Sequence, residues 1–408
     1  MGKHHNELLF LAAEAQRERD PIAVQCIDLL SAMPVAEVDR EAEAVISAMV
    51  ASLWAGGWQP AELQRQGRVG CATTAASRLV SQAMATDHAG RRSVTLHARW
   101  VAQIDSLALP WADGGAGWIH RWAVDEGLER PQAVAAMVDV VCNLRYLPRL
   151  DPILPAPADG DRPSVAGGYD SWGGVGAESN PALERIRNLL AKAESTTFEA
   201  EAMAFTAKAQ ELMTRYAIDA ALVHGRGRDD DRPVAIRVPI DAPYVDHKSL
   251  LLQTVAAAGR CRSVFLPLVS MSTVVGYPAD IAAVELLFTS LLVQAQTAMT
   301  DAATRAPAGS RPRSQSFRSA FLAGYTSRIG ARLREINDAV YAQVESEQGS
   351  GFLPVLRSRS AAVDDFIADR FGKLVSSSVR RGYDADGWAR GSVAADNARL
   401  ASGLGAAS

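Results

Sequence analysis

Apolar residues recur every three or four positions along residues 1–150, which is the spacing of one face of an α-helix. Pro60 and Pro131 suit the first turn of a helix, because proline lacks an N–H group that this turn leaves unbonded in any case. The pattern predicts an all-helical domain over residues 1–150, with helices at 35–54, 72–85, 96–109 and 131–147.

Six of the tryptophans are concentrated in this region, and they do not alternate along strands as a base-stacking platform on a sheet would require. We therefore expect them to pack in the core, where their large rings bury most area. They are Trp54, Trp58, Trp100, Trp111, Trp118 and Trp122.

Residues 151–180 have no hydrophobic period and are rich in proline, glycine, serine and aspartate. This composition is typical of a flexible linker. The segment predicts the clearest domain boundary in the chain.

Two amphipathic helices follow in residues 181–225. Asn180 can cap the first helix with Pro181 at its first position, and Thr196 and Glu199 form a capping-box pattern that starts the second. A short break between two apolar faces predicts that the helices fold back as a hairpin. The first face consists of Leu183, Ile186, Leu190 and Ala193, and the second of Phe198, Ala202, Phe205, Ala209, Leu212 and Tyr216.

Residues 232–400 mix short strands with helices, followed by a tail at 401–408. Asp384-Ala-Asp386-Gly387 predicts an Asp-Gly turn rather than a calcium loop, because the later ligands are missing. The fold class is therefore mainly α: an all-helical N-terminal domain, a helical hairpin and a C-terminal α+β module with a small sheet. The expected strands are 234–240, 263–266 and 273–277, with helices at 248–258, 280–304, 317–344 and 361–371.

The hairpin sequence resembles the bacterial and phage family known as domain of unknown function 2786. The family pattern is Ile-x-x-Leu-Leu-x-x-Ala-Glu-Ser, then Glu-Ala, then Lys-Ala-Gln-Glu-Leu-Met. The segments VVGYPADIAAVELLFTSLL and SFRSAFLAGYTSRIGARL also resemble the module that often accompanies this hairpin. The resemblance implies a fold and a bacterial or phage setting, but no activity. Its matching residues are Ile186, Leu189, Leu190, Ala193, Glu194, Ser195, Glu199, Ala200 and 208–213.

Composition and local motifs do not indicate a metal centre, a cofactor or a membrane protein. The cysteines are far apart, no two histidines are four residues apart, and no nucleophile elbow or phosphate loop is present. The apolar stretch 281–295 contains Glu285 and Gln294, so we expect a buried helix there. The N-terminal sequence lacks a signal-peptide pattern. We expect no metal, no cofactor and a cytoplasmic location. The sequence leaves enzymatic activity open and favours a binding protein.

The polar residues of the hairpin are explained by a solvated or partner-facing surface. They are Glu194, Lys208, Gln210 and Glu211, and Glu211 is spaced to pair with Arg215.

Charge distribution gives the one positive functional signal. Residues 302–334 contain seven arginines and no acidic residue, although the net charge of the chain is -4. Arginines in a loop before a helix N-terminus suit phosphate oxygens. Of the 42 basic residues 37 are arginine. The alternative interpretation of this run is therefore a solvated face in a chain that uses arginine throughout. The candidate nucleic-acid-binding residues are Arg305, Arg311, Arg313, Arg318, Arg328 and Arg332, with Arg334 completing the run.

The sequence therefore favours a non-enzymatic protein that contacts nucleic acid or another polyanion through this arginine-rich segment. An acidic protein is the alternative partner. Two other functions stay open: an enzyme of unknown reaction with its site in the C-terminal module, and a scaffold whose N-terminal domain and hairpin bind proteins.

Overall fold

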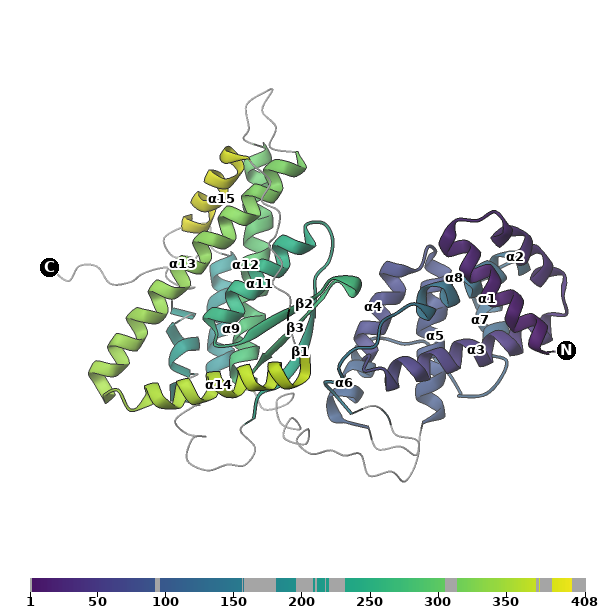
Figure 1. The fold of residues 1–408 in the computed structure, drawn as a ribbon, viewed down its shortest axis with the longest axis horizontal. Helices are drawn as coiled ribbons and strands as arrows, with labels where there is room; N and C mark the ends of the chain where they lie inside the picture. Colours follow the sequence, from purple (N-terminus) through teal and green to yellow (C-terminus); the bar gives the residue numbers. More distant parts are fainter. Residues whose placement is uncertain are drawn as a thin grey trace. The chain divides into compact units, whose positions relative to one another are not determined.

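The computed structural model divides the chain into two compact units, Met1–Gly176 (unit 1) and Ala177–Ser408 (unit 2). Figure 1 shows the elements of both. The structure describes residues 2–91, 96–155, 157, 181–195, 208–209, 211–216, 218–219, 232–304, 314–371, 374 and 384–397.

Unit 1 is helical in every regular element that the structure describes, as predicted. Pro60 begins one helix and Pro131 is the second residue of another. Five of the six tryptophans are buried, which confirms core packing, whereas Trp111 is 79% exposed. The helices are α1 (Gly2–Glu18), α2 (Ile22–Ala32), α3 (Val35–Ala55), α4 (Pro60–Gly70), α5 (Thr74–Gly90), α6 (Ala98–Ser106), α7 (Trp118–Asp125) and α8 (Arg130–Arg145).

Helix α8 forms the centre of unit 1 and contacts α1, α2, α3, α4 and α5. Its Asp139 is buried and accepts hydrogen bonds from the amides of Ala72 and Thr73, at 2.8 and 3.3 Å. A second buried carboxylate, Glu43 of α3, accepts the amide of Ile119 at 3.0 Å and so caps the start of α7. These polar residues satisfy backbone groups that burial would otherwise leave unbonded.

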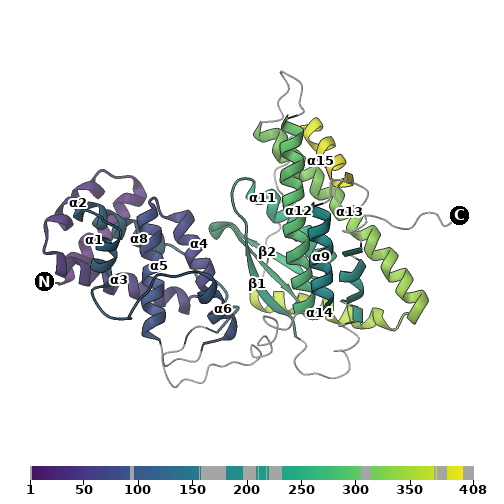
Figure 2. The same cartoon turned by 180° about the vertical axis from the view of Figure 1, so that it is seen from behind.

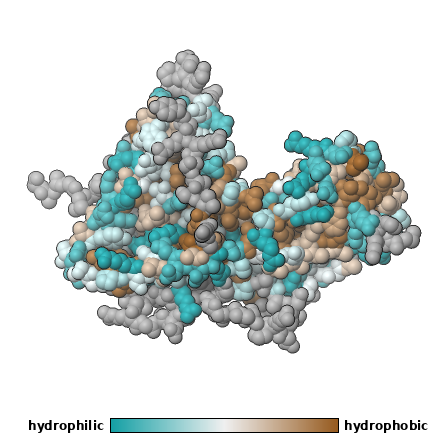
Figure 3. Space-filling model, in the orientation of Figure 1, coloured by the Kyte–Doolittle hydropathy of each residue, from teal (hydrophilic) through white to brown (hydrophobic). Residues whose placement is uncertain are grey.

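Apolar side chains also reach the surface of unit 1. Figure 3 shows apolar residues in brown over the part of this unit formed by α1 and α2. An exposed apolar surface of this kind is often covered by a protein partner. The exposed large apolar residues of α1 and α2 are Leu11, Ile22, Val24 and Leu29.

Unit 2 combines a three-stranded antiparallel sheet with long helices, as predicted. The strands lie in the order β1-β3-β2, with Val234 opposite Gly276 and Arg262 opposite Val275. Every residue of β3, the central strand, is buried. The elements are α9 (Pro181–Ser195), β1 (Val234–Pro239), α11 (Val245–Ala258), β2 (Arg262–Leu266), β3 (Met271–Gly276), α12 (Pro278–Thr304), α13 (Gln315–Gln348), α14 (Phe352–Phe371) and α15 (Ala385–Asn397).

Helix α13 contains the helix predicted at 317–344 and buries an apolar stripe that includes Phe317, Phe321 and Tyr325. Helix α15 lies along it (Figures 1 and 2). The two backbones approach closely because α15 presents glycines to α13. A Cβ atom on Gly391 would lie 2.0 Å from the carbonyl oxygen of Phe321, and one on Gly387 would lie 2.6 Å from that of Phe317. Only glycine fits at these two positions without a shift of backbone.

The Asp-Gly turn that the sequence predicts at residues 384–387 is wrong. Asp384 instead immediately precedes α15 and caps it: its side chain accepts the amide of Gly387 at 2.8 Å, and its carbonyl accepts the amide of Trp388 at 3.0 Å. An aspartate before a helix can cap the first turn as readily as it can form a turn of its own. Packing against α13 selects the helix here.

The described part of the hairpin packs into unit 2. Ile186 and Leu190 of α9 are buried, as predicted, and α9 contacts α12. Residues 208–209, 211–216 and 218–219 are helical, and Ile218 belongs to a buried cluster with Val340 and Val344 of α13. The predicted capping box at Thr196 and Glu199 lies outside the described residues.

One described helix, at Pro278–Ala302 within α12, is long and apolar enough to cross a membrane by length and composition. It contacts α9, α11, α13, α15 and β3. Packing inside unit 2 therefore accounts for its apolar character.

Candidate functional site

The predicted arginine stretch divides into two parts. Arg305, Arg311 and Arg313 lie outside the described residues. Arg318, Arg328 and Arg332 lie on α13, and the structure gives each of these three a different environment.

Arg332 is buried against the end of α15. Its Nη1 donates to the carbonyl oxygens of Ala395 and Asp396, the latter at 2.9 Å. Burial lowers the pKa of its guanidinium. The last carbonyl groups of a helix lack intrahelical partners. Arg332 therefore caps α15, and only 7% of its surface is exposed to a ligand.

Arg328 is nearer the surface and already has two acidic partners. It pairs with Asp396 of α15 and, at 3.2 Å, with Glu335. These hydrogen bonds raise the pKa of Arg328. Both carboxylates lie beyond residue 334, so the acid-free run in the sequence does not reveal them.

Arg318 has no such partners. Its Nε atom is buried and makes no hydrogen bond in the structure. Arg318 lies in the first turn of α13, where Ser314 caps the helix by accepting the amide of Phe317 at 3.1 Å. Of the three described arginines, Arg318 is the one for which no ion pair or backbone contact is found among the described residues.

A hollow of about 440 Å³ lies next to this turn and is lined by residues from two helix starts. We call it the α11–α13 hollow. Gln315 and Ser319 of α13 form one side, and Arg318 shares the helix surface with Gln315 because it is three residues along. The other lining residues come from the start of α11 and the segment before it: Pro243, Tyr244, Val245, Asp246 and His247.

The α11 side of the hollow contains an unusual histidine. His247 is buried, its Nε2 atom has no hydrogen-bond partner, and burial lowers its pKa. The adjacent Lys248 is also buried, and its Nζ donates to the carbonyl oxygen of Asp241 at 2.7 Å. No hydrogen bond joins Ser319 and His247, so this described surface does not contain a paired nucleophile and base.

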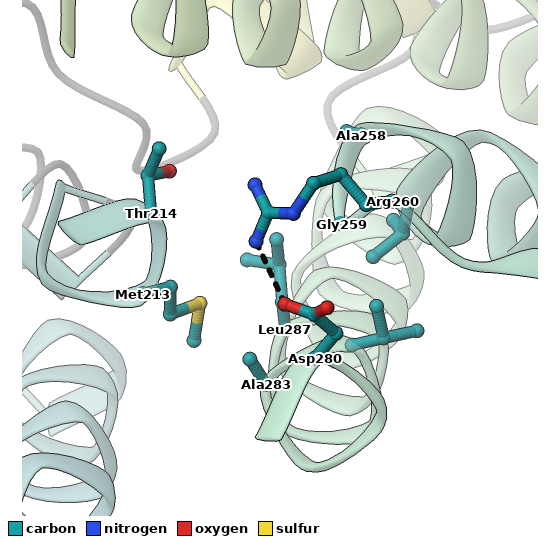
Figure 4. Close-up of a pocket in the computed structure, with 10 residues that line it drawn as sticks. Met213, Thr214, Ala258, Gly259, Arg260, Asp280, Ala283 and Leu287 are labelled. Carbon is teal, nitrogen blue, oxygen red and sulfur yellow. Dashed lines mark hydrogen bonds and ion pairs between the residues drawn. The ribbon is translucent and has the colours of Figure 1, made fainter. Parts of the chain in front are cut away.

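A separate, smaller pocket of about 20 Å³ lies elsewhere in unit 2, and Figure 4 shows its lining. Arg260 and Asp280 face each other across it, with 2.7 Å between Nη2 and Oδ1. Arg260 also donates to the hydroxyl of Tyr341 at 3.1 Å. Thr214, from the hairpin, faces the same space and bonds Asn337 at 3.0 Å. The pocket is too small for a ligand. The Thr214–Asn337 hydrogen bond joins the hairpin to α13, and Arg260 joins α12 to α13 through Asp280 and Tyr341.

The polar residues of the hairpin make local ion pairs. The predicted pair of Glu211 and Arg215 is confirmed at 3.4 Å, and Lys208 also approaches Glu211 at 2.9 Å. Arg215 in addition pairs with Glu347 at the end of α13. The described part of this surface therefore stabilises the hairpin on α13. Glu194 and Gln210 lack a described side chain.

Sequence reasoning missed the α11–α13 hollow and His247. No motif marks them, since an unbonded buried nitrogen depends on residues that lie far apart in the chain. Within the described residues, no cluster of three or more histidine, cysteine or acidic side chains could hold a metal ion.

Comparison with known proteins identifies the hairpin and nothing else. No curated protein and no solved structure matches the chain. One family model matches, over residues 182–220. This range includes the residues, from Ile186 to Met213, on which the resemblance in the sequence rests. The bacterial or phage setting and the companion module stay predictions. The chain thus carries, at residues 182–220, the hairpin of the family described as Protein of unknown function (DUF2786).

Proposed function

We propose that this chain is a non-enzymatic binding protein that contacts nucleic acid through the first turn of α13 and the arginine-containing segment before it. The observation that supports this most directly is Arg318, which forms no ion pair among the described residues and lies in the first turn of α13. A guanidinium offers five N–H donors and binds phosphate oxygens in pairs. The lack of an acidic partner distinguishes Arg318 from Arg328, which pairs with Asp396 and Glu335.

The surroundings of Arg318 support the same function. Residues 302–334 contain no acidic side chain that would repel a phosphate. The helix start adds positive potential, because its first amides point outward without intrahelical acceptors. Arg328 and Arg332 are not part of the proposed contact, since α15 and Glu335 already hold them.

Fluorescence anisotropy with a labelled single-stranded oligonucleotide tests this function. Affinity should fall linearly with salt on logarithmic axes, and Arg318→Met should make the slope shallower by about 0.7, the value for one phosphate contact with a single strand. Changing Arg305, Arg311 and Arg313 to methionine as well should weaken binding further.

Two matched variants are the controls. Arg68→Met removes the same charge from an exposed position on α4, in unit 1. Arg328→Met removes an arginine that is already paired on α13. Neither should change the salt slope. Absence of binding by the wild type at low salt, or equal effects of Arg318→Met and Arg68→Met, would contradict the proposal.

A further inference from the structure

Another hollow in unit 2, of about 430 Å³, follows one face of α14. Its lining residues on α14 succeed one another at three- and four-residue spacing, which places them on the same side of the helix. From Leu353 to Asp364 they extend over about 16 Å, at 1.5 Å per residue. Tyr341 of α13 and Arg260, which follows α11, complete the lining. We call this space the α14 hollow, and its volume falls within the range of small-molecule sites, about 300–1,000 Å³.

Three polar side chains of the α14 hollow have hydrogens that no described residue accepts. The hydroxyl of Tyr341 accepts a hydrogen bond from Nη1 of Arg260 at 3.1 Å, so its own hydrogen is free to be donated elsewhere. Arg357 is exposed and forms no ion pair with a described residue, and Ser360 likewise has no hydrogen bond in the described part of unit 2. Arg357 and Ser360 are three residues apart and therefore neighbours on the helix surface.

The backbone of Arg260 indicates that its side chain is needed at this position. Its φ angle is +58°, in the left-handed region that glycine adopts more readily than any other residue. Such conformations are concentrated at ligand sites, where the surrounding structure holds them in place. Here the guanidinium occupies the acceptor side of the Tyr341 hydroxyl and so fixes the direction in which that hydroxyl can donate.

The charges around the hollow leave one cation without a described partner. Arg260 pairs with Asp280 at 2.7 Å. Asp364, the one carboxylate among the lining residues, pairs with Arg262 at 2.8 Å. Arg357 therefore supplies a single net positive charge, which a ligand with a charge of -1 would balance.

The start of the hollow is apolar. Leu356 is buried, Leu353 is half-buried, and both belong to the apolar packing between α13 and α14. An aliphatic group that covered them would remove further apolar surface from water. Ser360 lies one turn beyond Leu356, so a ligand here needs an apolar part and an anionic part side by side.

We propose that the α14 hollow binds an aliphatic carboxylate, a small acid with an apolar tail. A carboxylate has about four lone-pair positions and can accept two N–H groups from one guanidinium. The fork of Arg357 and the hydroxyls of Tyr341 and Ser360 supply four such donors. A phosphate monoester has a charge of about -1.5 to -2, more than one cation balances. This inference goes beyond the nucleic-acid function and uses none of its residues.

Calorimetric titration of the full chain with octanoate tests the site. We expect one molecule to bind, and octanamide, which has the same chain without the charge, to bind about tenfold or more weakly, the effect of one lost hydrogen bond to a charged group. Butyrate should lose about fourfold in affinity for each missing methylene that the hollow would cover. Inorganic phosphate should not compete.

Three variants locate the site. Arg357→Gln should weaken octanoate binding about tenfold or more, and folding should be unaffected because Arg357 is exposed. Ser360→Ala should weaken it about three- to tenfold, the effect of one ordinary hydrogen bond. Arg334→Gln is the matched control, since it removes the same charge from an exposed position on α13, and it should leave the affinity unchanged.

Equal binding of octanoate and octanamide, or equal effects of Arg357→Gln and Arg334→Gln, would overturn the proposal. Thermal unfolding gives a second measure, because a ligand of the folded state raises the midpoint. Octanoate should raise it in the wild type and much less in Arg357→Gln. A peptide ending in leucine with a free carboxylate is the comparison for a protein C-terminus. Should it bind more tightly than octanoate, the hollow is a protein-docking site instead and the proposal is wrong.

Discussion

Arg332 offers a direct test of whether an arginine in the acid-free run is structural or available to a ligand. Arg332→Met keeps most of the side-chain volume and removes the guanidinium that caps α15. Each hydrogen bond from a charged group contributes about 1.5–3 kcal/mol. Part of this is offset, because burying the guanidinium costs free energy, as its lowered pKa shows. We expect a net loss of about 2–4 kcal/mol in the stability of the α13–α15 packing.

Hydrogen exchange of the α15 amides, measured by mass spectrometry, reports the free energy of opening this helix. A loss of about 2–4 kcal/mol speeds amide exchange in residues 385–397 by about 30- to 1000-fold, at 1.4 kcal/mol per factor of ten. Arg334→Met is the control, because Arg334 is exposed two residues further along the same helix. Arg334→Met should change the opening free energy of α15 by no more than about 0.5 kcal/mol.

The reasoning fails if Arg332→Met and Arg334→Met leave α15 with equal protection. It also fails if Arg332→Met weakens oligonucleotide binding while α15 exchanges as slowly as in the wild type. Either result would mean that the guanidinium contributes little to α15.

Three further predictions concern other parts of unit 2. In a denaturant titration, Gly391→Ala should lower the unfolding free energy of the unit by about 1–3 kcal/mol, because its Cβ would lie 2.0 Å from a carbonyl oxygen. Gly351→Ala is the control and should have almost no effect, because its Cβ would meet nothing within 4 Å. Asp280→Asn should cost about 3–5 kcal/mol by leaving the buried Arg260 charge without its partner, and a calorimetric transition unchanged in temperature would contradict this. Burial lowers the pKa of His247 from 6.5, so the unfolded chain binds the proton more tightly and stability should fall as the pH drops below about 6.5 in phosphate-free buffer. His247→Gln should flatten that pH dependence, and identical slopes in the two proteins would exclude the histidine as its source.

The main helices were predictable because their signals are repetitive. The stripe from Phe317 to Val340 keeps one apolar face through many turns, and that period needs no tertiary information. Helix α15 was not predictable in this way. Gly387 and Gly391 lower its intrinsic helix propensity, and the same two glycines are what allow its close packing on α13.

The candidate site shows a different limit. The sequence gives the positions of the arginines but not their partners, and Asp396 lies 68 residues from Arg328. It also gives no sign that His247 lacks a partner, because that depends on how α11 packs beside α13. Charge counting therefore located the arginines of α13 but not the acidic and backbone partners of Arg328 and Arg332.

Helix α13 also acts as a spacer between the hairpin and the α11–α13 hollow. Gln315 lines the hollow, and Asn337, 22 residues further along, bonds the hairpin. At 1.5 Å per residue the two points are about 33 Å apart. Charge interactions in physiological salt decay over about 8 Å. Changes to the ion pairs of the hairpin therefore leave the electric field at the hollow unaltered, so the two regions can vary independently within one protein.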